Sequence, residues 1–372
     1  QLSHITTKNQ TNIGCRQTQK KSNTTGISLH GLNMGDIVKI LVTGGAGFIG
    51  SNFIRYMLAK YRDIRIVNMD LLTYSGRLEN LRDIMNDPRH KFVKGDIRDR
   101  KKVQKVVKQG FNAIINFAAE THVDRSIAEP DSFITTDAYG TYILLDTAKS
   151  YEIERFVHIS TDEVYGSIKE GSFKETDTLQ PSSPYSASKA AGDLLTLAFH
   201  KTYDLLTTIT RSSNNFGPYQ HLEKFIPKMI VRALHNQPLP LYGDGKQIRD
   251  WLYVIDNCEA IDIVAWKGTP GEVYNVASGN ERTNIEIARL VLHNLKKNQS
   301  LISFVPDRPG HDRRYSLAIS KIKNLGWRPK YSFEDAIKET VEWYAKNEWW
   351  WQPLLTDKFV QSDTPWTQLV GN

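Results

Sequence analysis

The sequence has few cysteines, no long apolar run and no acidic residue in its first 33 positions. Only Cys15 and Cys258 occur, so neither a disulfide framework nor a thiolate metal site can be assembled. The longest apolar stretches, such as 113–119, are far too short to span a bilayer. The N-terminus also lacks the apolar core of a secretory signal. These absences predict a cytoplasmic protein with no membrane partner and no metal.

The balance of charge excludes one further class of partner. The formal net charge is +7, but Lys8, Arg16, Lys20 and Lys21 supply four of those charges, and residues 34–372 carry an excess of only about three. No other basic block alternates with aromatic residues as a single-strand binder requires. We therefore predict no nucleic-acid partner.

The pattern of apolar residues divides the chain into segments. Residues 1–33 are polar, show no apolar period and stop just before Met34, which predicts a disordered leader, either native or added during cloning. Short β-branched runs at 38–42, 64–69, 91–94, 113–117 and 156–159 then alternate with helical segments. This alternation is typical of an α/β protein with a doubly wound parallel sheet of the Rossmann type.

The alternation loosens after about residue 211, which predicts a smaller, partly interleaved C-terminal substrate domain. The predicted division is a Rossmann domain at 34–211 with later returns near 254–278, a mainly substrate-binding domain at 212–355 and a tail at 356–372. Ligands of such sheets bind beyond the carboxyl ends of the strands. The motifs described below fall at such ends or in loops that can fold over them.

A glycine-rich segment lies where the first strand ends and a helix begins. In GGAGFIG (44–50), glycines allow a tight turn and let backbone N–H groups approach a pyrophosphate. Asp70 closes the second strand, where a carboxylate accepts from a ribose 2′-hydroxyl and repels a 2′-phosphate, so NAD is favoured over NADP. Asp96 and Ile97 follow the next strand, where they could hold the adenine edge. The candidate cofactor residues from these patterns are Gly44, Gly47, Phe48, Ile49, Gly50, Asp70, Asp96 and Ile97.

The segment YSASK (185–189) opens a helical run that continues to residue 203. Its spacing of four places Tyr185 and Lys189 on one helix face. A lysine ammonium and a nicotinamide cation would favour the phenolate, although moving a tyrosine pKa from about 10 to about 7 takes roughly 4 kcal/mol. Tyr185 would then accept an alcohol proton as hydride leaves.

A third motif, STDEVYG (160–166), sets Asp162 beside Glu163 after an apolar run that indicates a buried strand. Two adjacent carboxylates repel each other. Burying either one without a partner costs free energy or causes it to take up a proton. This stretch alone is compatible both with a solvated loop and with a reactive pair.

Taken with NFAAETHVDRSI (116–127), SNNFGPYQ (213–220), GDGKQIRDWLYV (243–254) and DRPGHDRRY (307–315), these motifs resemble the dTDP-glucose 4,6-dehydratases. These enzymes belong to the extended short-chain dehydrogenase/reductases. The resemblance runs from about residue 37 to about residue 355. It implies NAD as cofactor, adds Ala118, Ala119, Tyr185 and Lys189 to the cofactor site, and implies a homodimer built on helices near 132–149 and 185–203.

The resemblance also implies a role for the carboxylate pair, because losing water across C5 and C6 of a 4-keto sugar needs a base and an acid. It implies that Tyr185 takes the 4-hydroxyl proton while NAD accepts the C4 hydride. Glu163 would remove the C5 proton, and protonated Asp162 would assist departure of the 6-hydroxyl before hydride returns to C6. Thr161 would bond O4, and Lys189 would hold the ribose and lower the pKa of Tyr185.

For the nucleotide sugar, the resemblance implies a set of polar residues that includes Arg313, with Arg314 as an alternative. Arginine suits a diphosphate because its planar fork makes two charge-assisted hydrogen bonds. Asp137 departs from the family pattern, which has asparagine at this position, and the tail has no recognised counterpart. The implied substrate residues are His122, Asn215, Lys224, Arg249, Asn284, His311 and Arg313.

Three other functions compete with this prediction. A nucleotide-sugar 4-epimerase shares the fold, the cofactor, Tyr185 and Lys189, but has no use for an acid and a base at C5 and C6. A UDP-glucose 4,6-dehydratase would use the same chemistry and read a different base. A non-catalytic NAD-bound sensor would be expected to lack a catalytic residue, and all five are present. Rhamnose and other deoxysugars remain open as the later product.

Overall fold

The computed structural model describes residues 37–308 and 311–364. The predicted leader, Met34 and the last part of the predicted tail (365–372) lie outside the described residues. Within the described ranges, no helix has both the length and the apolar character needed to cross a membrane.

A parallel sheet of seven strands forms the centre of the fold, in the order β10-β6-β5-β4-β1-β2-β3. The order reverses beside β1, which lies between β2 and β4, so a crevice opens there at the carboxyl ends of the strands. This confirms the predicted doubly wound sheet. The strands are β1 (Val38–Thr43), β2 (Ile64–Asp70), β3 (His90–Lys94), β4 (Ala113–Asn116), β5 (Arg155–Thr161), β6 (Thr207–Ser212) and β10 (Glu272–Val276).

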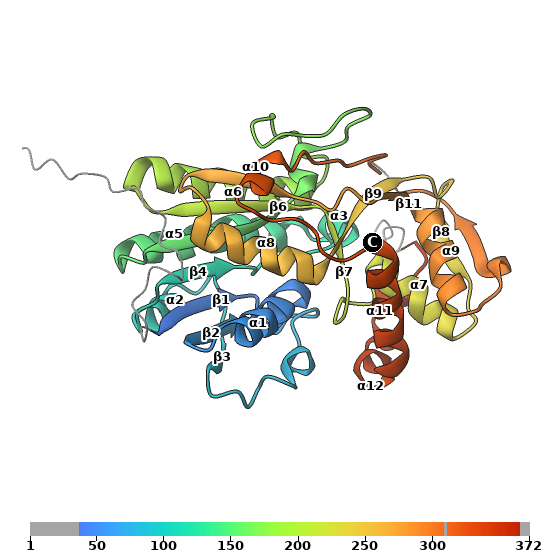
Figure 1. Cartoon of the computed structure of the whole chain (residues 1–372), viewed down its shortest axis with the longest axis horizontal. Helices are drawn as coiled ribbons and strands as arrows, with labels where there is room; N and C mark the ends of the chain where they lie inside the picture. Colours follow the sequence, from blue (N-terminus) through green and yellow to red (C-terminus); the bar gives the residue numbers. More distant parts are fainter. Residues whose placement is uncertain (1–36, 309–310, 365–372) are drawn as a thin grey trace, which may run out of the picture.

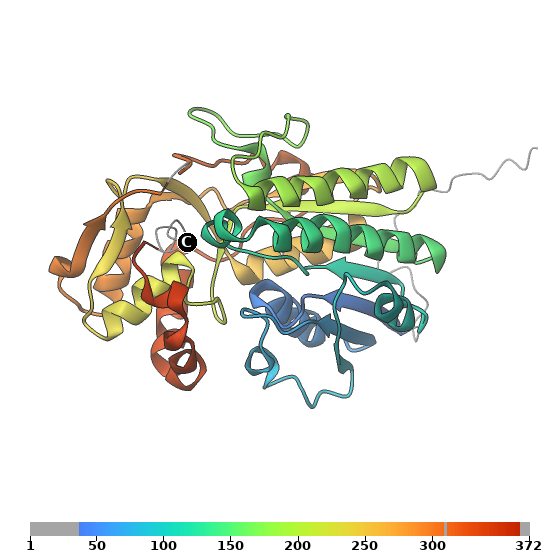
Figure 2. The same cartoon turned by 180° about the vertical axis from the view of Figure 1, so that it is seen from behind.

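Helices cover both faces of this sheet, which explains why strands such as β1 and β4 are mainly apolar runs rather than alternating patterns. Ile40 and Val42 of β1 pack on the face covered by α1 (Phe48–Lys60) and α8 (Val254–Lys267), which is toward the viewer in Figure 1. Leu41 packs on the opposite face, seen in Figure 2, against α2 (Arg100–Val107) and α5 (Thr141–Ser150), beside α6 (Pro184–Tyr203).

The connection from β4 to α5 contains an unusual helical segment. After α3 (Val123–Ala128) and α4 (Pro130–Phe133), residues Ile134–Gly140 form a π-helix that leads directly into α5. The sequence predicts helix near 132–149 but gives no sign of the wider turn. Such π segments are rare and are frequent at functional sites. This one buries Asp137 against α6.

The C-terminal part of the chain builds two small sheets and several helices beside the carboxyl edge of the large sheet (Figure 1). The chain passes back to the large sheet through α8 and β10, so the two parts are interleaved. The further elements are β7 (Asn214–Phe216), α7 (Phe225–Leu234), β8 (Leu239–Tyr242), β9 (Ile248–Tyr253), β11 (Glu281–Thr283), α9 (Asn284–Asn294), β12 (Ile302–Val305), α10 (Ser320–Asn324), α11 (Phe333–Lys346), α12 (Glu348–Trp351) and α13 (Lys358–Gln361).

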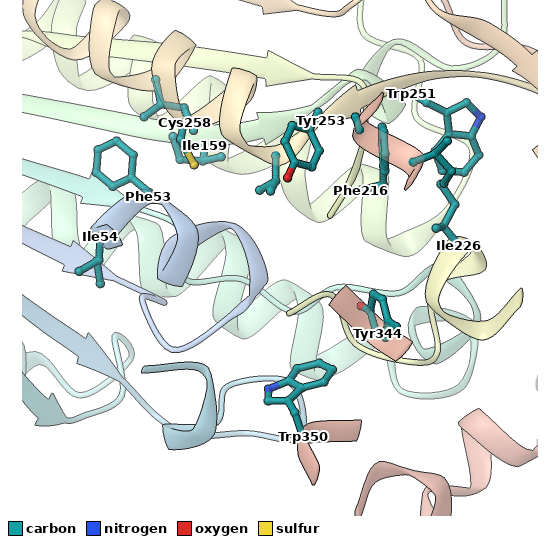
Figure 3. Packing of buried hydrophobic residues seen from close by; sticks show 14 of the residues in the cluster. Phe53, Ile54, Ile159, Phe216, Ile226, Trp251, Tyr253, Cys258, Tyr344 and Trp350 are labelled. Atoms are coloured by element: carbon teal, nitrogen blue, oxygen red, sulfur yellow. The ribbon is translucent and has the colours of Figure 1, made fainter. Parts of the chain in front are cut away.

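One continuous apolar core joins the two parts. It runs from Phe53 and Cys258 beside the large sheet to Phe216 and Tyr344 in the C-terminal part (Figure 3). Trp350 is buried at the end of this core, and its indole Nε1 donates a hydrogen bond of 2.8 Å to Asn80 Oδ1 in the first part. The shared core fixes the position of the C-terminal part over the crevice.

Removal of the Phe216 ring tests the shared core. Phe216 is fully buried and contacts the rings of Trp251, Tyr253 and Phe333. We expect Phe216→Ala to lower the free energy of unfolding by about 3–5 kcal/mol, because it leaves a cavity among aromatic rings. Urea unfolding measures this change. Phe304→Ala, at a side chain that is exposed on β12, is the matched control, and an equal loss in both variants would contradict the assignment.

Candidate active site

The glycine segment forms a cradle between β1 and α1. Gly44 has φ +71°, and a Cβ there would lie 2.5 Å from the backbone nitrogen of Ala118. A Cβ on Gly50 would lie 2.4 Å from the Gly44 carbonyl oxygen. Gly47 is the N-cap of α1, and no side chain caps this end of the helix. The backbone N–H groups of the first turn therefore have no partner within the helix and remain free to bind a ligand in the crevice. This arrangement fits a pyrophosphate at the helix N-terminus.

Asp70 lies at the end of β2 beside this cradle. Its carboxylate accepts hydrogen bonds from the Ala46 N–H at 2.9 Å and the Leu72 N–H at 2.8 Å. Burial raises the pKa of Asp70, and these two hydrogen bonds oppose the rise. The side chain is therefore held in one orientation at the wall of the crevice, where a ribose would bind.

A single cavity has in its lining every residue that the sequence assigns to the cofactor. Asp96 is further held by Arg98, with 2.7 Å between carboxylate and guanidinium. The predicted set in the lining is Gly44, Gly47, Phe48, Ile49, Gly50, Asp70, Asp96, Ile97, Ala118, Ala119, Tyr185 and Lys189. Thr73, Thr121 and Thr136, which the sequence analysis did not select, add hydroxyl groups to the same wall.

Tyr185 and Lys189 are placed by the start of α6. Ser183 and Ser186 form a reciprocal capping box, and Pro184 occupies the first helical position, so the helix begins just before Tyr185. Lys189 follows one turn later and donates from Nζ to the Ile159 carbonyl oxygen at 2.7 Å. The phenol of Tyr185 is hydrogen-bonded to the side chain of Thr161.

The electrostatics around Tyr185 differ from the sequence-based expectation. Burial raises the pKa of Tyr185 well above its ordinary value, and the negative charges of Glu163, Asp137 and Asp162 raise it further. Burial also lowers the pKa of Lys189. The chain alone therefore favours the neutral phenol, because carboxylates surround it. The charge needed for a phenolate has to come from the nicotinamide ring, with Lys189 as a secondary source.

Asp162 and Glu163 do not lie in a solvated loop. They begin a 3-10 turn (Asp162–Tyr165) directly after β5, and Asp162 is 2% exposed. Thr161 donates to Asp162 Oδ1 at 3.1 Å, while the other carboxylate oxygen has no hydrogen-bond partner among the described residues. Burial, and then the charge of Glu163, raises the pKa of Asp162 to about 8. Asp162 is therefore protonated at neutral pH.

Glu163 differs from its neighbour in its charged surroundings. Burial raises the pKa of Glu163, but the positive charges of Arg308, Arg249 and Lys224 oppose that rise. Three cations around one carboxyl favour its ionised form. The two adjacent carboxyl groups therefore differ in their charged surroundings, with three cations acting on Glu163 and only Arg249 acting on Asp162.

Of the implied substrate residues, Lys224 and Arg249 act on this pair, and His122 and Asn215 are also held in defined positions. Lys224 lines the cavity and donates to Thr121 Oγ1 at 3.0 Å. Arg249 lies over the Tyr315 ring at 4.3 Å and acts on both carboxyl groups. His122 has a strained φ of +132°, and burial lowers its pKa to about 4. Asn215 donates to the Ser213 carbonyl oxygen at 2.9 Å.

Lys224 is the one implied substrate residue in the lining of the cofactor cavity, and the remaining three residues of the set are Arg313, Asn284 and His311. Arg313 is exposed and paired with Asp244 at 2.9 Å, and its alternative Arg314 is paired with Glu281. Asn284 is the first residue of α9. His311 contacts Asp307 at 2.6 Å, and burial lowers its pKa to about 4.

Arg308 is the arginine of the DRPGHDRRY motif that approaches the site. Its side chain is only 16% exposed, it pairs with Asp124 at 2.8 Å, and its charge acts on Glu163. Arg308 is not among the predicted substrate residues, although it lies in a motif that the prediction used. The pair of Arg125 with Glu223, at 2.9 Å beside the cavity, was missed as well. Within residues 37–308 and 311–364, no cluster of His, Cys, Asp and Glu is arranged to hold a metal ion.

The fold and the site together define an NAD-dependent Rossmann enzyme of the extended short-chain dehydrogenase/reductase class, with a tyrosine and a lysine on one helix and two carboxyl groups whose charge acts on that tyrosine. Residues 41–340 match the family model described as GDP-mannose 4,6 dehydratase, and the chain belongs to this family.

The relatives of the chain include proteins of similar length. A dTDP-glucose 4,6-dehydratase from Streptomyces niveus is 49% identical over 322 residues, covering 85% of this chain and 96% of the relative. A low-salt glycan biosynthesis protein, Agl12, from Haloferax volcanii is 51% identical over 309 residues, covering 83% and 99%. The crystal structure of DesIV, a dTDP-glucose 4,6-dehydratase from Streptomyces venezuelae with NAD bound, has a TM-score of 0.83 and 47% identity, covering 85% and 100%.

The protonation of Asp162 gives a testable pH dependence. An acid whose pKa is raised to about 8 by burial donates a proton below that pH and loses this ability as the pH rises through it. We expect the rate of water loss from a 4-keto intermediate to fall above pH 8. Asp162→Asn should lower the rate at neutral pH by about 100-fold and remove the decline. The same decline in the variant would assign it to another group.

Proposed function

We infer that the chain converts dTDP-glucose to dTDP-4-keto-6-deoxyglucose and water, with NAD as its cofactor. The observation that carries this conclusion is the buried carboxyl pair at the end of β5. Burial and the charge of Glu163 raise the pKa of Asp162 to about 8, while three cations oppose the rise in the pKa of Glu163. Elimination of water needs both an acid and a base. A 4-epimerase, which only inverts C4, needs neither group.

The roles of the side chains follow from their contacts. Tyr185 accepts the proton of the sugar 4-hydroxyl, and Thr161, which is hydrogen-bonded to the phenol, binds the same oxygen. Glu163 then takes the proton from C5, Asp162 gives its proton to the departing 6-hydroxyl, and Glu163 later returns a proton to C5. Loss of the proton that Tyr185 gained and uptake of one proton by Asp162, both by exchange with solvent, restore the starting state. When bound, NAD supplies the hydride acceptor for C4, the hydride donor for C6 and positive charge near the phenol.

The residues for the nucleotide diphosphate are proposed from position and charge. Arg249 and Lys224 act on Glu163, and we propose that they bind the anionic substrate together with Arg308, which replaces Arg313 in this role. Asn215, Asn284, His122 and His311 stay as proposed contacts. The curated relatives named dTDP-glucose 4,6-dehydratase, at 44–49% identity, favour thymine over uracil or guanine as the base.

We propose that the two interleaved parts of the chain bind different ligands. Residues 34–211, with 254–278, bind NAD, and residues 212–355 bind most of the nucleotide sugar. We also propose a cytoplasmic location, because the thiol of Cys258 is free and buried, with burial raising its pKa.

Incubation of the purified protein with substrate tests the activity. Without added NAD, we expect dTDP-glucose to lose the mass of one water and UDP-glucose to stay unchanged, because NAD is regenerated within one turnover and remains bound. Liquid chromatography with mass detection measures both. Conversion to the galactose isomer, with unchanged mass, would replace this proposal with an epimerase.

Glu163→Gln is the matched control for the chemistry, since it keeps the size of the side chain and removes the base. This variant should reduce its bound cofactor when dTDP-glucose is added, which near-ultraviolet absorbance detects, while no water is lost. Formation of the dehydrated sugar at the wild-type rate would reject the role of Glu163.

We further propose a homodimer through the π-helix and α6. These elements pack against each other and expose apolar side chains: Ile134 (54%), Tyr139 (50%), Leu194 (59%) and Tyr203 (50%). Figure 2 shows α5 and α6 side by side on this face. Such a face is typical of an interface.

Light scattering at micromolar concentration tests the dimer. The wild-type protein should have the mass of two chains, and Leu194→Glu should have the mass of one, because a charge would be buried without a partner. Phe304→Glu, at an equally exposed apolar residue on β12, should remain a dimer. A single-chain mass for the wild type would remove the proposal.

A further inference from the structure

Asp137 is a buried carboxyl group that the proposed reaction does not use. It lies inside the π-helix and is 1% exposed. Its Oδ1 accepts a hydrogen bond from the Glu120 N–H at 2.8 Å, in the wall of the cofactor cavity. Its Oδ2 accepts a hydrogen bond of 2.7 Å from the hydroxyl of Ser188, which lies on α6. The side chain therefore joins the cavity wall to the residue next to Lys189.

The packing of α6 brings the π-helix close to Lys189. Gly192 permits this approach, because a Cβ there would lie 3.2 Å from the Asp137 carbonyl oxygen and 2.8 Å from His158 Nε2. Asp137 and Asp193 are the carboxyl groups whose charge acts on Lys189. Asp193 is already paired with Arg211 at 2.7 Å. Asp137 has no salt bridge within the described residues, so its charge remains to act on Lys189 and Tyr185.

The other charged and titratable groups around Asp137 do not cancel it. Glu120 carries the same sign, and burial, then Asp137, raises the pKa of Glu120 to about 7. Arg98 acts on Glu120 rather than on Asp137. His158 on β5 is buried, and burial lowers its pKa well below its ordinary value, so it is neutral.

We propose that Asp137 is a positioning residue whose negative charge sets the pH window in which Tyr185 and Lys189 work. The inference rests on the proposed function. The carboxylate favours the protonated form of both groups, because a negative neighbour stabilises an ammonium ion and destabilises a phenolate. Burial raises the pKa of Asp137 itself to about 6, so the carboxylate is present at neutral pH.

Asparagine would preserve the geometry and remove only the charge. Its amide oxygen can accept from the Glu120 N–H, and its amide nitrogen can donate to the Ser188 hydroxyl, which also bonds the Tyr185 carbonyl oxygen at 2.8 Å. Asparagine is also the residue that the family resemblance leads us to expect here. Asp137→Asn therefore removes the negative charge of this side chain and keeps its hydrogen bonds.

The experiment follows cofactor reduction in the first half of the reaction. Glu163→Gln, alone and combined with Asp137→Asn, is mixed with dTDP-glucose between about pH 5 and about pH 10, and the rate of rise in near-ultraviolet absorbance is recorded. We expect Asp137→Asn to move both limbs of the pH profile toward acid by about one unit. On the acid limb, the rate at a given pH should therefore rise about tenfold when it is expressed relative to the maximum rate of the same protein.

Controls separate the charge of Asp137 from a structural role. Asp131→Asn removes an exposed carboxyl group just before the π-helix and should leave both limbs in place. Ser188→Ala removes a donor to the carboxylate, which makes Asp137 hold its proton to higher pH. It should move the limbs in the same direction by less, and it tests the inference if Asp137→Asn does not fold.

Two results would overturn the inference. A lower rate with both limbs unmoved would show that Asp137 only supports the structure, and the proposed function would stand. Absence of reduced cofactor in the parent protein, together with absence of dehydrated product from the wild type, would reject the proposed function and this inference with it.

Discussion

The removal of water from charged groups at the carboxyl end of β5 is the constraint on which the site depends. Burial is the largest influence on the proton affinity of Asp162, Glu163, Tyr185 and Lys189 alike. It favours the neutral form of each, so the nearby charges decide which group ionises. Three cations act on Glu163, while the largest effect of a charge on Asp162 is that of the Glu163 carboxylate. The same burial thus leaves two adjacent carboxyl groups with different proton affinities, because their charged neighbours differ.

This burial is possible because the two parts of the chain share one core. Arg249, Arg308 and Lys224 come from the C-terminal part, and they reach Glu163 only because that part is fixed over the crevice. The chain returns through α8 and β10 to the large sheet, so the two parts cannot separate without exposing apolar surface. A rigid placement of this kind holds donors where charge develops in a reaction.

Sequence patterns predicted much of the fold where they are strong. Buried strands such as β1 and β4 are mainly apolar runs, and the glycine motif and the start of α6 carry local signals that tertiary contacts do not alter. Strand β6 was not predicted, because its sequence TTITRS is polar although all of its residues are buried. The π-helix was also missed, since the periodicity of 134–140 does not reveal its wider turn.

The sequence by itself determined the chemistry that is available: a glycine cradle, a tyrosine and lysine one turn apart, and two adjacent carboxyl groups after a strand. These follow from residue type and local spacing. Only the tertiary structure decided which arginine approaches the carboxyl pair, because Arg308 and Arg313 lie in one motif but point to different surroundings. It also decided which carboxyl group holds a proton, since burial and the sum of distant charges set each pKa, and neither is encoded locally.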